Sequence, residues 1–134
     1  MGDQLRILLI DDVREDAELA ERELRKSGLE FISKYIVTLD SLVQELSEFK
    51  PDIVLTDYML PGFNGMDVID VIKKNAPSIP VIIVTGSINE ETAVECIKSG
   101  AYDYVLKQHL IRLGSAVKNT LKQKQAELEK LRAE

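Results

Sequence analysis

Residues 5–12 read Leu-Arg-Ile-Leu-Leu-Ile-Asp-Asp, a largely apolar run that ends in two carboxylates. A nearly continuous apolar run is typical of a strand that helices cover on both faces of a parallel sheet. Helical spacing of apolar residues follows it, and strand-like and helix-like patterns alternate five times along the 134 residues. This alternation predicts βα units around a parallel sheet, in one domain of ordinary size.

Three later apolar runs also end in a polar side chain. Residues 53–56 lead into Asp57, residues 81–84 into Thr85, and residues 104–106 into Lys107. The carboxyl ends of neighbouring parallel strands meet at one edge of the sheet, where open α/β folds build their sites. We therefore expect one site to contain the side chains of Asp11, Asp12, Asp57, Thr85 and Lys107.

These side chains suit a divalent metal ion and a phosphoryl group. Carboxylate oxygens are the ligands that Mg²⁺ prefers, and Mg²⁺ completes its shell with water and phosphate oxygens. Asp57 could attack phosphorus as a nucleophile and become an acyl phosphate. A metal and Lys107 would neutralise charge on the transferred group, and the hydroxyl of Thr85 could donate to one of its oxygens.

Each of these residues also has a purely structural explanation. Asp12 with Glu15 could cap the first helix, Asp57 could be a turn residue, and Lys107 could be a solvated lysine. Their joint placement at strand ends favours the site, because capping does not require a lysine after the last strand.

Composition narrows the class of protein. Hydrophobic residues make up 45% of the chain, so a core needs no metal or disulfide, and there is one cysteine, Cys96. The formal net charge of −6 argues against direct nucleic-acid binding by this segment, because phosphate backbones select basic surfaces. No apolar run approaches the roughly 18 residues of a membrane span, and no signal peptide is expected. We predict a cytoplasmic protein without membrane association.

Local signals predict the ends of several elements. Gly28 fits the position that ends the first helix, and the alternating residues 31–37 suggest an edge strand. Residues 61–65 suggest a loop, with Asn64 as N-cap of a helix from Gly65 to about Asn75. Residues 87–90, Ser-Ile-Asn-Glu, match the capping-box pattern and predict a helix that ends near Gly100.

The last helix is expected to run from about residue 110 to the end and to extend beyond the sheet. Its last twenty residues carry five basic and three acidic side chains. We place a domain over residues 1–121 and a helical extension over residues 122–134. The extension is either a solvated tail or a coiled-coil segment that forms a homodimer or leads into a further domain. The apolar positions that suggest a coiled coil are Leu113, Val117, Leu121, Leu128 and Leu131, with Lys124 in the intervening slot.

The chain resembles the receiver domain of two-component response regulators over about residues 5–121. Five stretches carry the resemblance: Ile-Leu-Leu-Ile-Asp-Asp at 7–12, Asp-Ile-Val-Leu-Thr-Asp at 52–57, Leu-Pro-Gly-Phe-Asn-Gly at 60–65, Val-Ile-Ile-Val-Thr-Gly at 81–86 and Gly-Ala-Tyr-Asp-Tyr-Val-Leu-Lys at 100–107. The resemblance implies a flavodoxin-like (βα)5 fold, a doubly wound parallel sheet with strand order 2-1-3-4-5. Composition and periodicity alone do not imply that order.

The resemblance also implies a role for each site residue. Asp57 would be the phosphoacceptor, and Lys107 the partner of the phosphoryl group. Asp11, Asp12, Asp57 and the backbone carbonyl of Met59 would bind Mg²⁺, with Asp12 as the direct ligand and Asp11 acting through water. Thr85 and Tyr104 would form the switch pair.

The same resemblance implies the partners. The phosphoryl donor would be a sensor histidine kinase or a phosphotransfer protein. The output surface would consist of the fourth helix, the last strand and the last helix, over about residues 89–121. The domain would be regulatory rather than an enzyme, although it would promote its own phosphorylation and dephosphorylation.

The chain departs from the family pattern at Gln108, where receivers usually have a proline that often follows a cis peptide bond. A non-proline cis bond costs about 3–4 kcal/mol, so we expect a trans bond and a differently shaped last loop. His109 is expected at the surface, and Cys96 is expected to be packed and inert.

Two other functions compete with a phosphorylation-activated switch. An unphosphorylated dimerisation or scaffold module is slightly favoured by Gln108 and the helical extension, but the retained acidic residues, Thr85 and Lys107 count against it. A flavodoxin-like enzyme or nucleotide binder would need a glycine-rich phosphate loop, whereas Asp-Asp-Val-Arg-Glu follows the first strand.

Overall fold

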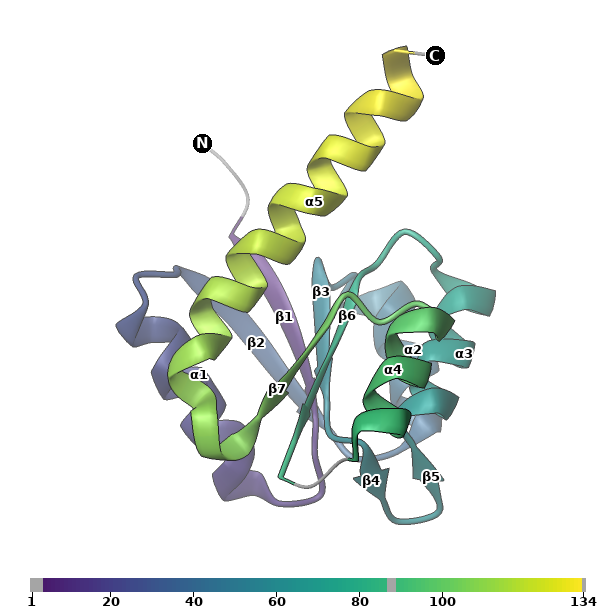
Figure 1. Cartoon of the computed structure of the whole chain (residues 1–134). Coiled ribbons are helices and arrows are strands. Elements are labelled where there is room, and N and C mark those ends of the chain that lie inside the picture. Colours follow the sequence, from purple (N-terminus) through teal and green to yellow (C-terminus); the bar gives the residue numbers. More distant parts are fainter. Residues whose placement is uncertain (1–3, 87–88, 134) are drawn as a thin grey trace.

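The computed structural model describes residues 4–86 and 89–133, and five parallel strands form its central sheet. The strands lie in the order β2-β1-β3-β6-β7 (Figure 1). This is order 2-1-3-4-5 when only the sheet strands are counted, so the flavodoxin-like α/β topology is confirmed. The strands are β1 (Leu5–Ile10), β2 (Phe31–Ile36), β3 (Ile53–Thr56), β6 (Val81–Thr85) and β7 (Asp103–Leu106).

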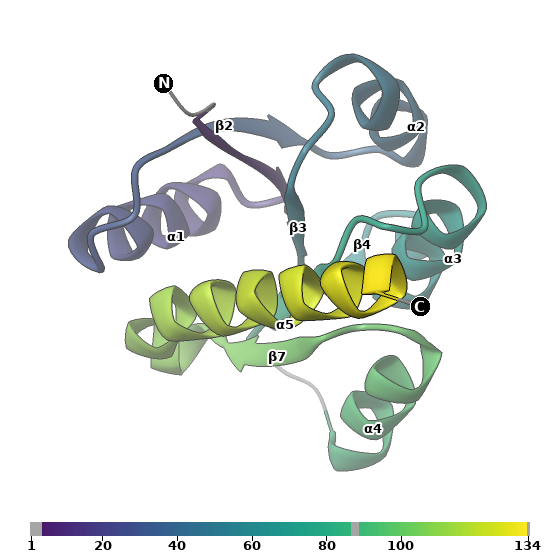
Figure 2. The same cartoon turned by 90° about the horizontal axis from the view of Figure 1, so that it is seen from above.

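Helices cover both faces of the sheet, as Figures 1 and 2 show. On one face lie α1 (Arg14–Lys26) and α5 (Leu113–Ala133), and on the other lie α2 (Leu39–Glu48), α3 (Gly65–Asn75) and α4 (Glu90–Ser99). Successive strand residues point to opposite faces, so β1 supplies Ile7 and Leu9 to one core and Leu8 and Ile10 to the other.

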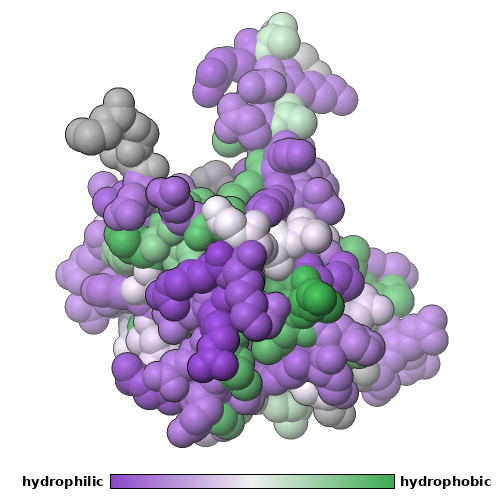
Figure 3. Space-filling model, turned by 90° about the vertical axis from the view of Figure 1, so that its left-hand side faces the viewer, coloured by the Kyte–Doolittle hydropathy of each residue, from purple (hydrophilic) through white to green (hydrophobic). Residues whose placement is uncertain are grey.

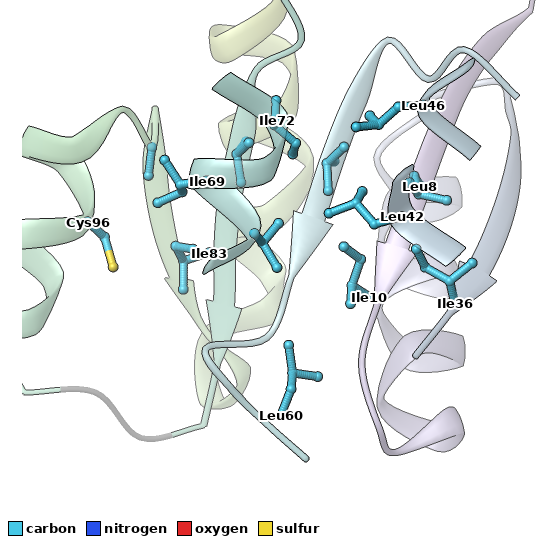
Figure 4. Close-up of a cluster of buried hydrophobic side chains, with 14 residues drawn as sticks. Leu8, Ile10, Ile36, Leu42, Leu46, Leu60, Ile69, Ile72, Ile83 and Cys96 are labelled. Carbon is cyan, nitrogen blue, oxygen red and sulfur yellow. The ribbon is translucent and has the colours of Figure 1, made fainter. Parts of the chain in front are cut away.

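The core under α2, α3 and α4 is shown in Figure 4. Leu8 and Ile10 of β1 lie there beside Leu42 of α2, and Cys96 of α4 belongs to the same cluster with no exposed surface. The prediction that Cys96 is packed is therefore confirmed.

Several predicted element ends are confirmed. α1 ends at Lys26, and Gly28 has a φ of +91°, a conformation that side chains with a Cβ rarely adopt. Asn64 caps α3: its side chain accepts from the backbone N–H groups of Met66 and Asp67, and the Asp67 carboxylate accepts from the Asn64 N–H. β2 is an edge strand with half-exposed residues, as its alternation indicated.

Two segments differ from the prediction. The loop expected near residues 61–65 contains a small hairpin, β4 (Met59–Leu60) and β5 (Phe63–Asn64). Pro61 presets φ in its two-residue turn, and Gly62 supplies a φ of +84°. The last helix begins later than expected: a 3₁₀ helix, η1 (Lys107–Arg112), precedes α5 and includes a non-helical backbone conformation at His109.

The start of α4 is only partly testable. Ser87 and Ile88, which opened the predicted capping box, lie outside the described residues. Within the described residues, Asn89 is the N-cap of α4, and its side chain accepts from the backbone N–H of Thr92.

α5 extends beyond the sheet at the edge opposite β4 and β5 (Figure 1). Hydrophilic side chains cover most of the face in Figure 3, and the end of α5 projects above it. None of the helices in the described ranges is long and apolar enough to cross a membrane.

The first turns of the extension still contact the domain. The Tyr102 hydroxyl donates to the Glu127 carboxylate, 2.8 and 3.0 Å from its two oxygens. Lys124 Nζ lies 5.9 Å from the centre of the Tyr102 ring. A hollow of about 250 Å³ lies between this part of α5 and the loops that precede β3 and β6. The residues that line it include Pro51, Ile79, Pro80, Leu121, Lys124 and Leu128.

Candidate functional site

The register of the sheet brings Asp11 and Asp57 together. Ile10 and Thr56 are partners across β1 and β3, and each aspartate is the next residue on its strand. The Asp57 N–H donates to the Ile10 carbonyl at 2.8 Å. Side-chain oxygens of Asp11, Asp12 and Asp57 all lie within 4.8 Å of one another. The structure thus gathers three carboxylates from two strand ends.

Lys107, directly after β7, joins this cluster. Its Nζ forms ion pairs with Asp11 at 2.8 Å, Asp16 at 2.8 Å and Asp57 at 3.0 Å. Only 19% of the lysine side chain is exposed. The loop change at Gln108 therefore leaves the lysine aimed at Asp57.

Asp16 was missed as a site residue by the sequence analysis. The available signal was its place in the first turn of α1, directly after the two aspartates of the first strand end. Acidic residues are favoured in a first helical turn in any protein, so that signal does not by itself indicate a site. Only the pairing with Lys107 does so.

Burial destabilises the charged form of Asp11. Desolvation raises the pKa of its carboxyl group, and the hydrogen bonds from Lys107 and from the Val13 N–H at 2.9 Å offset this only in part. Burial therefore makes the charged form of Asp11 less favourable in the folded protein than in solution.

The pKa of Lys107 shifts in the direction that favours its charged form. Burial alone would lower its pKa, but hydrogen bonds with Asp11, Asp16 and Asp57 outweigh this and raise the pKa above its ordinary value. The ammonium group therefore stays charged at neutral pH. Asp57 itself is 8% exposed, with Oδ1 accepting from the Tyr58 N–H at 2.7 Å and Oδ2 from Lys107.

The predicted switch residues lie on the two neighbouring strands. Thr85 ends β6, is 2% exposed and is the register partner of Leu106, which precedes Lys107. Tyr104 on β7 is 37% exposed. It lines a hollow of about 390 Å³ together with Val94 and Ile97 of α4.

Met59 lies in β4, with 67% of its surface exposed, and pairs with Asn64. Its carbonyl remains a predicted metal ligand. His109 is exposed, as expected.

The capping alternative for Asp12 is wrong. Within the described residues, Val13 is the N-cap of α1 and no side chain provides a capping hydrogen bond. Asp12 is exposed beside the other two carboxylates instead.

The residue after the lysine adopts the expected geometry. No cis peptide bond occurs in the described ranges, so the bond before Gln108 is trans. The Gln108 side chain donates from Nε2 to the Gly86 carbonyl at 3.0 Å, a contact that no local pattern in the sequence indicates.

The fold and the site together define a flavodoxin-like α/β domain with an acidic cluster and a lysine at the carboxyl edge of its sheet. The family profile of the response regulator receiver domain matches residues 7–118. The chain belongs to this family. It is thus a regulatory domain of two-component signal transduction.

Relatives and solved structures agree with this assignment. The chain is 32% identical over 103 residues to the nitrogen assimilation regulatory protein NtrX of Azorhizobium caulinodans, covering 75% of this chain and 22% of NtrX. It is 36% identical over 102 residues to the DNA-binding response regulator MtrA of Mycolicibacterium smegmatis, covering 76% of this chain and 43% of MtrA. The chain therefore spans less than half the length of these curated relatives.

Two solved structures of receiver domains share the fold. A response regulator receiver domain protein from Clostridium thermocellum has a TM-score of 0.79 and 29% identity, with 91% of this chain and 98% of that chain covered. The BeF3-activated DrrB receiver domain has a TM-score of 0.76 and 25% identity, with 90% and 99% covered.

Proposed function

We propose that the chain is a phosphorylation-activated signalling switch. Asp57 accepts a phosphoryl group from a sensor histidine kinase or a phosphotransfer protein. The observation that carries the proposal is the Lys107 ammonium 3.0 Å from Asp57, beside a set of three carboxylates that can hold a cation.

The carboxylates fit Mg²⁺. Asp11, Asp12 and Asp57 would hold the ion, together with the carbonyl of Met59. Their donors are all oxygen atoms, and a dication would relieve the unfavourable charge of the buried Asp11. When bound, Mg²⁺ supplies positive charge to the oxygens of the transferred group.

The transfer forms a bond between a carboxylate oxygen of Asp57 and phosphorus, and it breaks the N–P bond of a phosphohistidine. The imidazole nitrogen keeps the electron pair of that bond and takes up a proton. Lys107 provides a fixed positive charge where negative charge collects on the phosphoryl oxygens, so it needs little rearrangement during transfer.

The phosphorylated state would then move the switch pair. The Thr85 hydroxyl would donate to a phosphoryl oxygen, and the half-exposed Tyr104 ring would turn inward behind it. Phosphorylation would shift a pre-existing equilibrium between two conformations. The output face would be α4, β7, η1 and the start of α5, where exposed apolar side chains include Val94 and Ile97 of α4 and Ile111 of η1.

We further propose the division into a receiver domain over residues 1–121 and an extension over residues 122–134, in a cytoplasmic protein. The last helix could form a homodimer through its row of apolar positions. Leu121, Lys124 and Leu128 of this row line the hollow against their own domain, whereas Leu131 is 69% exposed. MtrA is a DNA-binding relative, but with a net charge of −6 we expect this segment itself to bind no DNA.

The test is the intact mass of the protein after treatment with acetyl phosphate and Mg²⁺, compared with Asp57→Asn. A Mg²⁺-dependent phosphoryl adduct on the wild type alone is expected. Light scattering on the same samples reports whether phosphorylation changes the oligomeric state. A folded wild type that takes up no phosphoryl group at saturating Mg²⁺ would contradict the proposal and favour the unphosphorylated scaffold module.

A further inference from the structure

We infer that Gln108 is a positioning residue for phosphoryl transfer, which ties the backbone after Thr85 to the residue after Lys107. The inference rests on the proposed function, because Thr85 and Lys107 are the two side chains expected to contact the phosphoryl group from β6 and β7.

The hydrogen bond of Gln108 continues the pairing of these two strands. Thr85 and Leu106 form the last register pair of β6 and β7. Beyond that pair, β7 continues into η1, and α4 is the next element after β6. The Gln108 side chain bridges them, donating from Nε2 to the Gly86 carbonyl at 3.0 Å. This hydrogen bond thereby links the segments after β6 and β7 just beyond their last paired residues.

Gly86 is also next to the lysine side chain. A Cβ atom built on Gly86 would lie 3.9 Å from Lys107 Cδ, an ordinary van der Waals distance. The backbone that Gln108 holds therefore lies beside the Lys107 side chain, with room for about one methyl group between them. Movement of Gly86 would change the packing of Lys107 as well as the position of Thr85.

The other end of the 3₁₀ segment is anchored too. Arg112 pairs with Asp103 at 3.1 Å and donates to the Tyr104 carbonyl. Between the two anchors, His109 departs from helical geometry, with φ −127° and ψ 43°. Gln108 and Arg112 thus hold η1 at both ends. A proline at position 108 would restrict the backbone directly but has no side-chain donor for Gly86.

The experiment compares the initial rate of Mg²⁺-dependent phosphorylation by acetyl phosphate in three variants. Gln108→Met keeps the length of the side chain and removes the donor, and Gln108→Glu keeps the shape and replaces the donor with a charged acceptor. Gln123→Met is the matched control, because Gln123 is an exposed glutamine of α5 away from the site. Both Gln108 variants are expected to react about three- to tenfold more slowly, the range that follows from one lost hydrogen bond.

Two further readouts separate positioning from general damage. The affinity for Mg²⁺ should remain within about twofold of wild type, because the cation ligands lie on other segments. In a Thr85→Ala background, the effect of Gln108→Met should largely disappear, since one of the groups that it positions is absent.

The outcomes are distinct. A wild type that forms no adduct overturns the proposed function, and this inference with it. A wild type that is phosphorylated, with both Gln108 variants as fast as Gln123→Met, overturns the inference alone. Slower variants with an equal loss of Mg²⁺ affinity, or with an undiminished effect in the Thr85→Ala background, overturn the positioning role and leave Gln108 a structural residue.

Discussion

The two ends of β7 hold their polar groups in opposite ways. Beyond its carboxyl end, the single ammonium of Lys107 lies in a cluster of four carboxylates, those of Asp11, Asp12, Asp16 and Asp57. Before its amino end, Tyr102 donates to one carboxylate, Glu127, beside one ammonium, Lys124. The first arrangement has an excess of negative charge, whereas the second is balanced.

Burial acts on both ends but with different consequences. It raises the pKa of Asp11, which ordinarily carries a charge at neutral pH, so the folded protein bears a cost there. It also raises the pKa of Tyr102 to about 12, with a further contribution from the hydrogen bond to Glu127. A phenol is neutral at pH 7 in any case, so that shift costs nothing. The end beside Lys107 therefore carries carboxylate charge in excess of its counter-charge, whereas the end beside Tyr102 anchors a helix.

The largest effect on stability is expected from Lys107→Met in the absence of metal. Removing the ammonium leaves partly buried carboxylates without their counter-charge, and we expect a loss of about 3 kcal/mol in the free energy of unfolding at pH 7. Urea denaturation measures it. The control is Lys74→Met, which removes an exposed pair with Asp70 at 3.9 Å and should cost below about 0.5 kcal/mol. Equal losses in the two variants would contradict the role given to Lys107.

Saturation with Mg²⁺ is expected to stabilise the wild type by about 2.7 kcal/mol when the free ion is at 100 times its dissociation constant. The physical reason is that the ion binds the folded acidic cluster and not the unfolded chain. Thermal unfolding with and without Mg²⁺ measures the gain. Asp12→Asn should lose most of it, whereas Asp70→Asn, which removes an exposed carboxylate on α3, should keep it. The same gain in Asp12→Asn would place the ion elsewhere.

Asp11→Asn is expected to stabilise the metal-free protein at pH 7, because the pKa of Asp11 is raised by burial. A raised carboxyl pKa favours the folded state below the ordinary value of 3.8, and this benefit is lost as the pH rises through the folded value. The gain from the variant should therefore shrink as the pH falls toward 4. The same variant should weaken Mg²⁺ binding. Destabilisation at pH 7 without metal would show that the pair with Lys107 outweighs desolvation.

Tyr102→Phe is expected to cost about 1 kcal/mol at pH 7, the contribution of one partly buried hydrogen bond. The pKa of Tyr102 is raised to about 12 in the folded state, so its contribution is complete below the ordinary value of 10 and is lost as the pH rises through about 12. The difference between wild type and variant should therefore vanish at strongly alkaline pH. Tyr104→Phe, at the half-exposed ring of the predicted switch pair, should leave stability unchanged.

The smallest effect is expected from shortening the chain after Leu128. Residues 129–133 are exposed, so their removal should change the free energy of unfolding by less than about 0.5 kcal/mol. Shortening after Leu121 should cost more than Tyr102→Phe, because it removes Lys124, Glu127 and Leu128 together. Equal stability of the two shortened chains would mean that Tyr102 does not anchor the extension.

Local chemistry in the sequence was enough for most of the fold. Alternation of apolar runs predicted the βα units, and the boundary of α3 followed from Asn64, because a capping box joins residues only three positions apart. The meeting of Asp11, Asp12, Asp57 and Lys107 was also predictable, since parallel strands end at a common edge. The strand order came from the family resemblance, because a sheet pairs segments that are distant along the chain.

Tertiary structure alone decided the contacts between distant segments whose side chains carry no local signal. Asp16 reaches Lys107 across 91 positions of sequence, and Gln108 reaches Gly86 across 22. The leucine spacing of the last helix was compatible with a coiled coil. In the structure, however, Leu121 and Leu128 face the loops that precede β3 and β6 of their own domain. Periodicity identifies an apolar face of a helix, but what that face meets depends on the direction in which the helix leaves the sheet.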